Sequence, residues 1–356
     1  MHNWQKKTKQ KNWKKPSLIF ISILLIFMFV IPSLIVIPFK GEKEVAVSTE
    51  AEQAADEGAE VVKQENQTLV SPFDIRVLRT EQHTVEEIPL EDYVAHVVAS
   101  EMPADFELEA LKAQGLAART YIVHFLMQEQ TESLPDGADV TDTVQHQVYK
   151  NEDELRQIWG SDYHWKIDKI KQAVAATQGT IITYEDQPIT PAFFSTSNGY
   201  TENSEDYWEN ELPYLRTVAS PWDEEISPKF LDQKVFTQAE LENKLAVDLA
   251  NQSGDFQLIR TESQRVESAV IGGQTFSGRD IREQLGLPSN DFTITKKNDH
   301  YVFTTKGFGH GVGMSQYGAN GMAQEGKDYE DIIAYYYQGT KLRSLEQATP
   351  TLLVKK

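Results

Sequence analysis

The chain has 356 residues, with 34 lysines and arginines, 54 aspartates and glutamates, and no cysteine, and its formal net charge is −20. Residues 1–40 hold seven of the basic residues and no acid, so the remainder has 27 basic against 54 acidic residues, a net charge of −27. This excess argues against nucleic acid or anionic lipid as a partner, because both are bound through basic patches. Acidity that simply keeps an exported domain soluble explains the charge equally well.

The N-terminal segment has the pattern of a membrane anchor. Six lysines fall within residues 1–16, and the stretch from Leu18 to Ile37 is apolar apart from Pro32 and serines. About twenty apolar residues span a bilayer, and the lysines predict a cytoplasmic N-terminus. A cleaved signal peptide is the alternative, but the exit sequence at residues 35–40 is poor for cleavage. We therefore expect a cytoplasmic tail (1–16), an uncleaved anchor (17–38) and an acidic linker (39–71), with the rest of the chain outside the cell membrane.

Residues 72–345 are expected to form one extracytoplasmic α+β catalytic domain, with a smaller α+β lobe inserted at about 227–301 and a loose tail at 346–356. An alternating strand starts near Phe73, and helical patterns run to Glu101 and from about 107 to 128. A third helical pattern ends at Gly179, before a strand at 180–184. In the lobe, residues 237–240 read as a capping box and Gly272-Gly273 and Asn298-Asp299 as hairpin turns, and Tyr329 to Tyr337 reads as a helix stopped by Gly339. Without disulfides, the domain must be stabilised by its hydrophobic core, and roughly 270 residues are enough to form one.

Glu101 is the first candidate for catalysis. It closes the first helical pattern, so its carboxylate lies near the negative end of that helix, among Val98, Met102 and Phe106. The helix dipole and the apolar neighbours both disfavour ionisation. A glutamate that stays partly protonated near neutral pH can act as a general acid.

Other polar residues could support such an acid. Lys112 and Arg119 are one heptad apart and share a helix face, either as a solvated basic stripe or as groups of the site. Ser195 and Ser197 follow an aromatic strand, and hydroxyls at a strand end suit sugar recognition. His310 has glycines on both sides and is either a site residue or a buried structural histidine.

Several other chemistries are disfavoured. No G-x-S-x-G elbow surrounds Ser195 or Ser197, and neither G-x-G-x-x-G nor P-loop spacing occurs in the glycine-rich segment 307–316. No two of the eight histidines are within five residues of each other, and there is no cysteine, so local spacing predicts no metal site. The sequence leaves open a metal site whose ligands are distant from one another along the chain.

The motifs together resemble one family. Residues 100–103, 109–114 and 117–121 (Ser-Glu-Met-Pro, Glu-Ala-Leu-Lys-Ala-Gln, Ala-Ala-Arg-Thr-Tyr), 194–199, 307–319 and 335–339 are similar to stage II sporulation protein D, in the same order. The resemblance covers about residues 72–342. Two departures matter: some members have a zinc-binding cysteine pair, which this chain lacks, and the family's Gly-Gly is Asn198-Gly199 here.

The resemblance implies a lytic transglycosylase of sporulation engulfment, with no cofactor carried over. Such an enzyme cuts glycan strands between N-acetylmuramic acid and N-acetylglucosamine and leaves 1,6-anhydro ends, with Glu101 as acid and base. The residues expected to hold the sugar are Lys112, Gln114, Arg119, Ser195, Ser197, His310, Ser315 and Gln316. The implied partners are an amidase (stage II sporulation protein P) and a membrane scaffold (stage II sporulation protein M), on the mother-cell side of the sporulation septum. The alternatives are a non-catalytic enhancer of a wall amidase and a structural wall anchor.

Overall fold

The computed structural model of the protein describes residues 69–128, 134–250 and 256–355, all of which belong to one compact unit, Gln64–Lys356. The expected cytoplasmic tail and anchor, and nearly all of the expected linker, lie outside the described residues. Across the three described ranges, no helix combines the length and apolar character that a membrane crossing requires.

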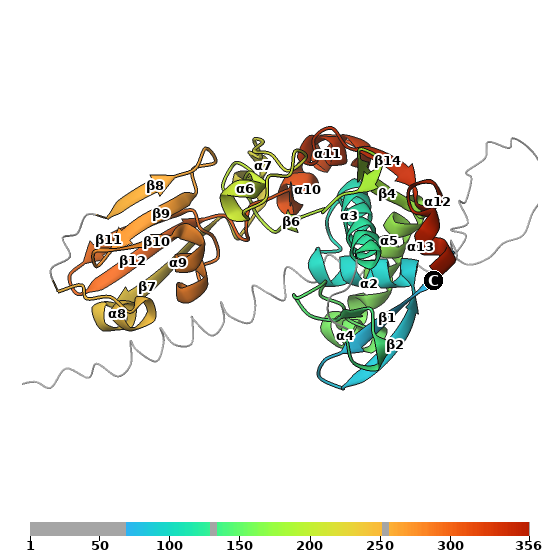
Figure 1. Cartoon of the computed structure of the whole chain (residues 1–356), viewed down its shortest axis with the longest axis horizontal. Coiled ribbons are helices and arrows are strands. Elements are labelled where there is room, and N and C mark those ends of the chain that lie inside the picture. Colours follow the sequence, from blue (N-terminus) through green and yellow to red (C-terminus); the bar gives the residue numbers. More distant parts are fainter. Residues whose placement is uncertain (1–68, 129–133, 251–255, 356) are drawn as a thin grey trace, which may run out of the picture. The chain divides into compact units, whose positions relative to one another are not determined.

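The described fold is α+β, as the sequence predicts (Figure 1). Its helices are α2 (Leu90–Glu101), α3 (Leu108–Met127), α4 (Glu152–Trp159), α5 (Tyr163–Ala176), α6 (Ser204–Tyr207), α7 (Trp222–Ile226), α8 (Gln238–Leu245), α9 (Gly278–Leu285), α10 (Gln316–Gln324), α11 (Tyr329–Tyr336), α12 (Leu345–Ala348) and α13 (Pro350–Lys355), with 3-10 turns η2 (Pro135–Gly137) and η3 (Gly160–Asp162). Its strands are β1 (Asp74–Arg79), β2 (Thr84–Pro89), β3 (Val140–Thr141), β4 (Thr180–Tyr184), β5 (Gln187–Pro188), β6 (Phe193–Phe194), β7 (Leu231–Thr237), β8 (Gln257–Arg260), β9 (Val266–Ile271), β10 (Gln274–Ser277), β11 (Phe292–Lys297), β12 (His300–Lys306), β13 (Met314–Ser315) and β14 (Lys341–Ser344).

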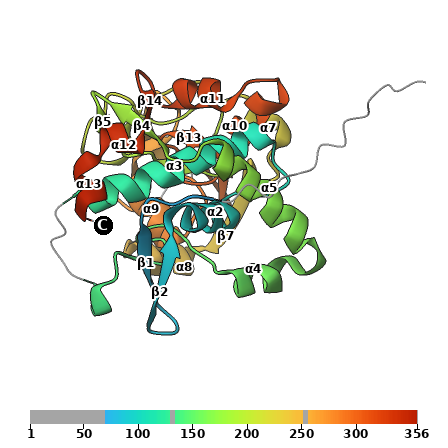
Figure 2. The same cartoon turned by 90° about the vertical axis from the view of Figure 1, so that its right-hand side faces the viewer.

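Helix α3 is the centre of the larger core. It packs against α2, α5, α10 and α11, and Figure 2 shows it running across this part of the molecule. Leu111, Leu116 and Ile122 are fully buried, which matches the apolar stripe predicted for residues 107–128. Small sheets with the orders β2-β1-β3 and β14-β4-β5 accompany these helices, and β4 packs against α3.

A second hydrophobic core is built from residues between Phe236 and Phe303. Its sheets have the orders β11-β12-β7 and β10-β9-β8, accompanied by α8 and α9. The capping box is confirmed: Thr237 accepts from the Glu240 amide, and the Glu240 carboxylate accepts from the Thr237 amide. Both hairpins are confirmed too, since Ile271 pairs with Gln274 and Lys297 pairs with His300.

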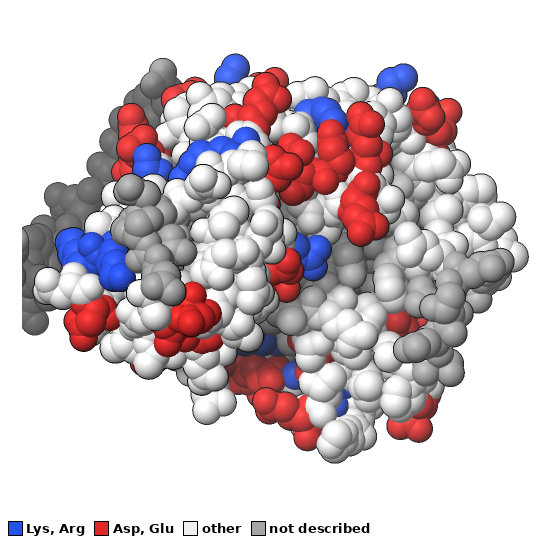
Figure 3. Space-filling view, turned by 60° about the vertical axis from the view of Figure 1, so that its left-hand side comes forward, with Lys and Arg blue, Asp and Glu red and all other residues white. Residues whose placement is uncertain are grey.

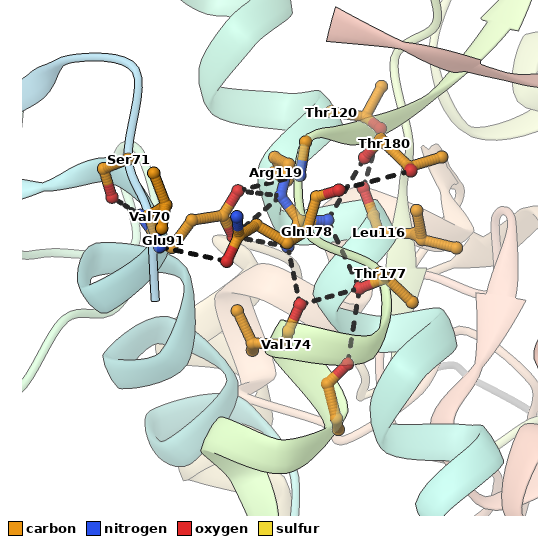
Figure 4. A network of polar contacts seen from close by, with 12 residues as sticks. Val70, Ser71, Glu91, Leu116, Arg119, Thr120, Val174, Thr177, Gln178 and Thr180 are labelled. Atoms are coloured by element: carbon orange, nitrogen blue, oxygen red, sulfur yellow. Dashed lines mark hydrogen bonds and ion pairs between the residues drawn. The ribbon is translucent and has the colours of Figure 1, made fainter. Parts of the chain in front are cut away.

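A buried ion pair between Glu91 and Arg119 joins α2 to α3 (Figure 4). Both side chains have 0% exposure, and the two Arg119 nitrogens Nε and Nη2 lie 2.9 and 2.6 Å from the two Glu91 oxygens. Arg119 also donates to the carbonyl oxygens of Thr180 at 3.1 Å and Val174 at 3.3 Å, and Glu91 accepts from the Gly179 amide. One pair therefore holds α2, α3, the end of α5 and the start of β4 together.

This placement corrects the prediction that Arg119 contacts the sugar. Its guanidinium is enclosed and its donors are directed at Glu91 and at backbone carbonyls, so it presents no group to a ligand at the surface.

We predict that Arg119→Met destabilises the fold by about 3–5 kcal/mol, because it leaves the Glu91 charge buried without its partner. Urea unfolding of the full chain in detergent solution measures this. The matched control is Arg156→Met on α4, whose pair with Glu152 has side chains 44% and 56% exposed and should be worth about 1 kcal/mol or less. Equal losses in the two variants would contradict the structural role of Arg119.

Candidate active site

Glu101 is the last residue of α2, as predicted, and its side chain is half-buried. The next residue, Met102, leaves the helix in an extended conformation and is 2% exposed. Burial raises the pKa of the Glu101 carboxyl above its ordinary value, while the Val148 backbone amide and the charge of Lys150 lower that pKa in part. Burial therefore favours the protonated form of the carboxyl, while the Val148 amide and Lys150 stabilise its charged form.

The segment that brings Val148 to Glu101 follows β3 and has no regular secondary structure. Its Gln147 is 3% exposed and accepts from the Tyr93 hydroxyl at 3.2 Å, and its amide nitrogen donates to the Ala118 carbonyl at 3.4 Å. These bonds attach the segment to α2 and to α3. Sequence reasoning missed the segment, because a backbone amide leaves no trace in residue types or periodicity.

Two of the predicted binding residues, Gln114 and Gln316, meet in the fold. Gln316 begins α10, and its amide nitrogen lies 3.5 Å from the Gln114 oxygen, a long hydrogen bond. Gln114 is fully buried, and its own amide nitrogen has no partner among the described residues. A buried donor without a partner carries a free-energy cost that a ligand oxygen would relieve.

Gln114 shares a face of α3 with Ala118 and Tyr121, at spacings of four and three residues. Gln147 donates to the backbone carbonyl of Ala118, so the segment that carries Val148 reaches α3 at this level of the helix. Tyr121 is half-buried, and its ring stacks on that of Phe125 with centroids 6.2 Å apart. This part of α3 therefore carries a buried amide and a half-buried aromatic ring.

Lys112 does not join this group in the structure. Its ammonium lies 2.6 Å from a Glu109 oxygen and 5.5 Å from the centre of the Tyr329 ring. Lys112 and Arg119 share a helix stripe, as predicted. Lys112 pairs with Glu109 near the start of α3, whereas Arg119 is buried against Glu91 of α2.

The predicted serines belong to a buried network around Asp223. Ser197 and Ser315 are both 0% exposed; the Ser197 amide donates to Asp223 at 2.7 Å, and Ser315 donates to the same carboxylate. Ser220 donates to its other oxygen at 2.6 Å. Ser315 also caps α10 by accepting from the Gly318 amide. The fold does not support the prediction that Ser197 and Ser315 contact the sugar, because both hydroxyls have partners inside the protein. The Ser197 hydroxyl donates to the Ser220 carbonyl at 3.0 Å, and the Ser315 hydroxyl joins Asp223 to the start of α10.

Ser195 remains half-buried, with its hydroxyl 3.4 Å from that of Thr196. The following residues of the same motif join this part of the fold to residues of the second core. Asn198 donates to the Asp291 carboxylate at 2.8 Å, and Arg265 donates to the Tyr200 carbonyl at 3.0 Å.

His310 is half-buried, and the packing of its ring favours the structural alternative. Its ring lies among Phe194, Tyr207 and Trp208, with centroids 5.4 to 5.8 Å away, and its Nδ1 accepts from the Val312 amide. Burial, helped by the charges of Arg282 and Arg265, lowers its pKa to about 3. The neighbouring Gly309 has φ 119°, and a Cβ there would lie 2.8 Å from Phe194, so glycine allows the close packing around this ring.

Metal ligands do not assemble in the described structure. Among the described residues, no three histidine, aspartate or glutamate side chains converge as a metal site, and the chain has no cysteine. The residues present do not fit the zinc-binding pair found in some relatives of the resembled family.

Comparison with known proteins agrees with the resemblance. The family described as stage II sporulation protein (SpoIID) matches residues 79–184. The chain is 49% identical over 345 residues to stage II sporulation protein D of Bacillus subtilis (strain 168), covering 95% of this chain and 98% of that protein. It is 47% identical over 344 residues to the Bacillus amyloliquefaciens protein of the same name, covering 96% of this chain and all of the relative.

A more distant relative has a different name. The amidase enhancer of Bacillus subtilis (strain 168) is 31% identical over 302 residues, which cover 70% of this chain and 40% of that protein. Together the matches place the chain among sporulation proteins. It belongs to the stage II sporulation protein D family.

We predict that folding stability falls as the pH drops from about 6.5 towards 3, and that His310→Phe reduces this slope. The unfolded chain binds a proton at the ordinary pKa of 6.5, whereas the folded chain binds it only near 3, so acid favours unfolding across this window. Urea unfolding at a series of pH values measures the slope. A variant that keeps the wild-type slope would show that His310 is charged in the fold.

Proposed function

We propose that the protein is a peptidoglycan lytic transglycosylase in which Glu101 is the general acid and base. The observation that carries the proposal is the setting of Glu101: a half-buried carboxyl with a raised pKa, which a backbone amide and Lys150 stabilise in its charged form. The family membership supplies the sporulation context.

The reaction needs one carboxyl group that can change its protonation state. Protonated Glu101 donates its proton to the glycosidic oxygen, and the bond between that oxygen and C1 of N-acetylmuramic acid breaks. The C6 hydroxyl of the same sugar bonds to C1, and its proton passes to the Glu101 carboxylate. The products are a 1,6-anhydro end and a free hydroxyl on N-acetylglucosamine, and no water is consumed.

Hydrolysing glycosidases normally use two carboxyl groups, about 5–10 Å apart. The proposed lyase reaction differs in needing one carboxyl group, because the attacking oxygen belongs to the sugar itself.

The acidic surface favours a glycan without its stem peptides. Acidic side chains form the larger groups on the face shown in Figure 3, with smaller basic groups between them. Stem peptides add carboxylates that such a surface repels, whereas a stripped strand presents mainly hydroxyls and amides. We infer that an amidase of the stage II sporulation protein P type acts first, and that a scaffold of the M type and the N-terminal segment hold the enzyme at the septal membrane.

The second candidate is a non-catalytic enhancer that binds and stimulates a wall amidase. The match to the amidase enhancer of Bacillus subtilis favours it. The two candidates differ in their products, because only the transglycosylase makes anhydro ends from bare strands by itself.

We predict that Glu101→Gln lowers the rate of anhydro-product formation from peptide-free strands on the order of 10²–10⁴-fold, since glutamine keeps the shape but cannot exchange a proton. Mass spectrometry of the products measures this. Glu107→Gln is the matched control, because Glu107 is exposed just before α3 and should tolerate the change. A folded Glu101→Gln protein with wild-type yield would refute the assignment, and a wild type that makes no anhydro ends would favour the enhancer.

We also predict that EDTA leaves the yield of anhydro product unchanged, because the proposed reaction moves protons through a carboxyl group and requires no Lewis acid. Product yield with and without the chelator checks this. Loss of turnover in EDTA that zinc restores would mean that a metal takes part.

A further inference from the structure

Strand β7 is an edge strand of the sheet β11-β12-β7. It has seven residues, and its pairing with β12 runs from Leu231 to Thr237 without a register shift. Edge strands in native proteins are usually short, bulged or interrupted by charges, because their unpaired amides and carbonyls can bind another strand. A regular edge strand of this length is therefore a candidate docking surface.

Two other edge strands of the second core carry the usual protection. The register of β8 is irregular between Ile259 and Arg260, and β11 ends on Lys296 and Lys297. Bulges and lysines of this kind hinder pairing with a further strand. Strand β7 has neither a register shift nor two adjacent like charges, so it differs from both.

The hydrogen bonds beside the two ends of β7 show which of its residues face the open edge. The Gly307 amide donates to the Phe230 carbonyl, and the Gln238 amide donates to the Asp299 carbonyl. Bonded positions alternate along an antiparallel pair, so the even-numbered residues of β7 bond to β12. Residues 231, 233 and 235 therefore direct their amides and carbonyls to the open edge.

The side chains of β7 alternate between the two faces of the sheet. Leu231 and Val235 are 60% and 57% exposed, and Gln233 between them is also exposed. On the opposite face, Asp232 is exposed and Lys234 is half-buried. The strand thus has two apolar residues on one face and two opposite charges on the other, and each set is symmetric about Gln233.

We propose that β7 pairs antiparallel with β7 of a second copy of this chain, with Gln233 on the two-fold axis. In this register Leu231 lies opposite Val235 of the second copy, and Asp232 lies opposite its Lys234. The odd-numbered residues form the hydrogen-bonded pairs, and the two charges fall at the non-bonded pairs, where side chains come closest. The pairing is independent of the proposed glycan chemistry.

Charge selects this register over its neighbours. A shift that centres the pair on Asp232 puts two carboxylates opposite each other, and a shift that centres it on Lys234 does the same for two ammonium groups. Like charges directly opposite each other destabilise a sheet, whereas opposite charges stabilise it. The Lys234 ammonium also bonds to the Gly286 carbonyl at the C-terminal end of α9, and it has further N–H groups for a carboxylate.

Single cysteines test the pairing, because the chain has none of its own. The two Cα atoms of a hydrogen-bonded pair are about 5.5 Å apart, a separation that a disulfide can bridge. We therefore expect Gln233→Cys to form a covalent dimer on mild oxidation of the purified full chain in detergent, seen by non-reducing electrophoresis. Leu231→Cys is the matched control on the same strand, because its two copies would lie about 13 Å apart and should not cross-link. A mixture of Leu231→Cys and Val235→Cys chains should cross-link, since these positions lie opposite each other.

Charge variants in the Gln233→Cys background test the register. Asp232→Lys and Lys234→Asp should each lower the initial rate of dimer formation about tenfold, because each places like charges opposite each other. Mixing the two variants should restore the rate, since every lysine then faces an aspartate of the other chain. Circular dichroism checks that both variants fold.

Absence of a dimer in Gln233→Cys, or equally fast dimer formation by Leu231→Cys alone, would overturn the proposal. Folded charge variants that do not recover on mixing would overturn it too. If the purified Gln233→Cys chain stays monomeric but cross-links to a different protein in sporulating cells, the edge binds that protein and the self-pairing is wrong.

Discussion

The buried pair of Glu91 and Arg119 is the interaction on which the larger part of the fold depends. Burying two charges is unfavourable unless each is fully bonded, and here the carboxylate and the guanidinium satisfy each other and also bind backbone groups at the end of α5 and the start of β4. The pair fixes how α2 lies along α3. Glu101 is the last residue of α2, so the pair also helps to fix where this carboxyl lies relative to α3.

The site combines opposing influences on a single carboxyl group. Burial favours the protonated form of Glu101, while the Val148 amide and Lys150 favour the charged form. A general acid that later acts as a base must populate both its protonated and its charged form. Burial alone would favour only the first form, and the amide and Lys150 alone would favour only the second. The loop that carries Val148 is therefore as much part of the site as the glutamate, and the contacts of Arg79, His146 and Gln147 keep that loop in place.

The sequence predicted what periodicity and local chemistry encode. The end of α2 at Glu101, the stripe of α3, and the capping box at Thr237 follow from spacing and from residue types within a few positions. The roles of Arg119, Ser197 and Ser315 did not follow, because a hydroxyl or a guanidinium has the same signature whether it faces a sugar or a buried carboxylate. Their partners, Glu91 and Asp223, are 26 to 92 residues distant along the chain. The backbone amide of Val148 has no residue-type signature at all.

The central claim is that the fold keeps Glu101 ready to hold a proton. The most direct measurement is the titration of the Glu101 side-chain carboxyl carbon by NMR in the folded protein, assigned by its loss in Glu101→Gln. The account predicts a midpoint above the ordinary value of 4.5. A midpoint at or below 4.5 would mean that Glu101 is an ordinary carboxylate at neutral pH, and would contradict its role as the general acid.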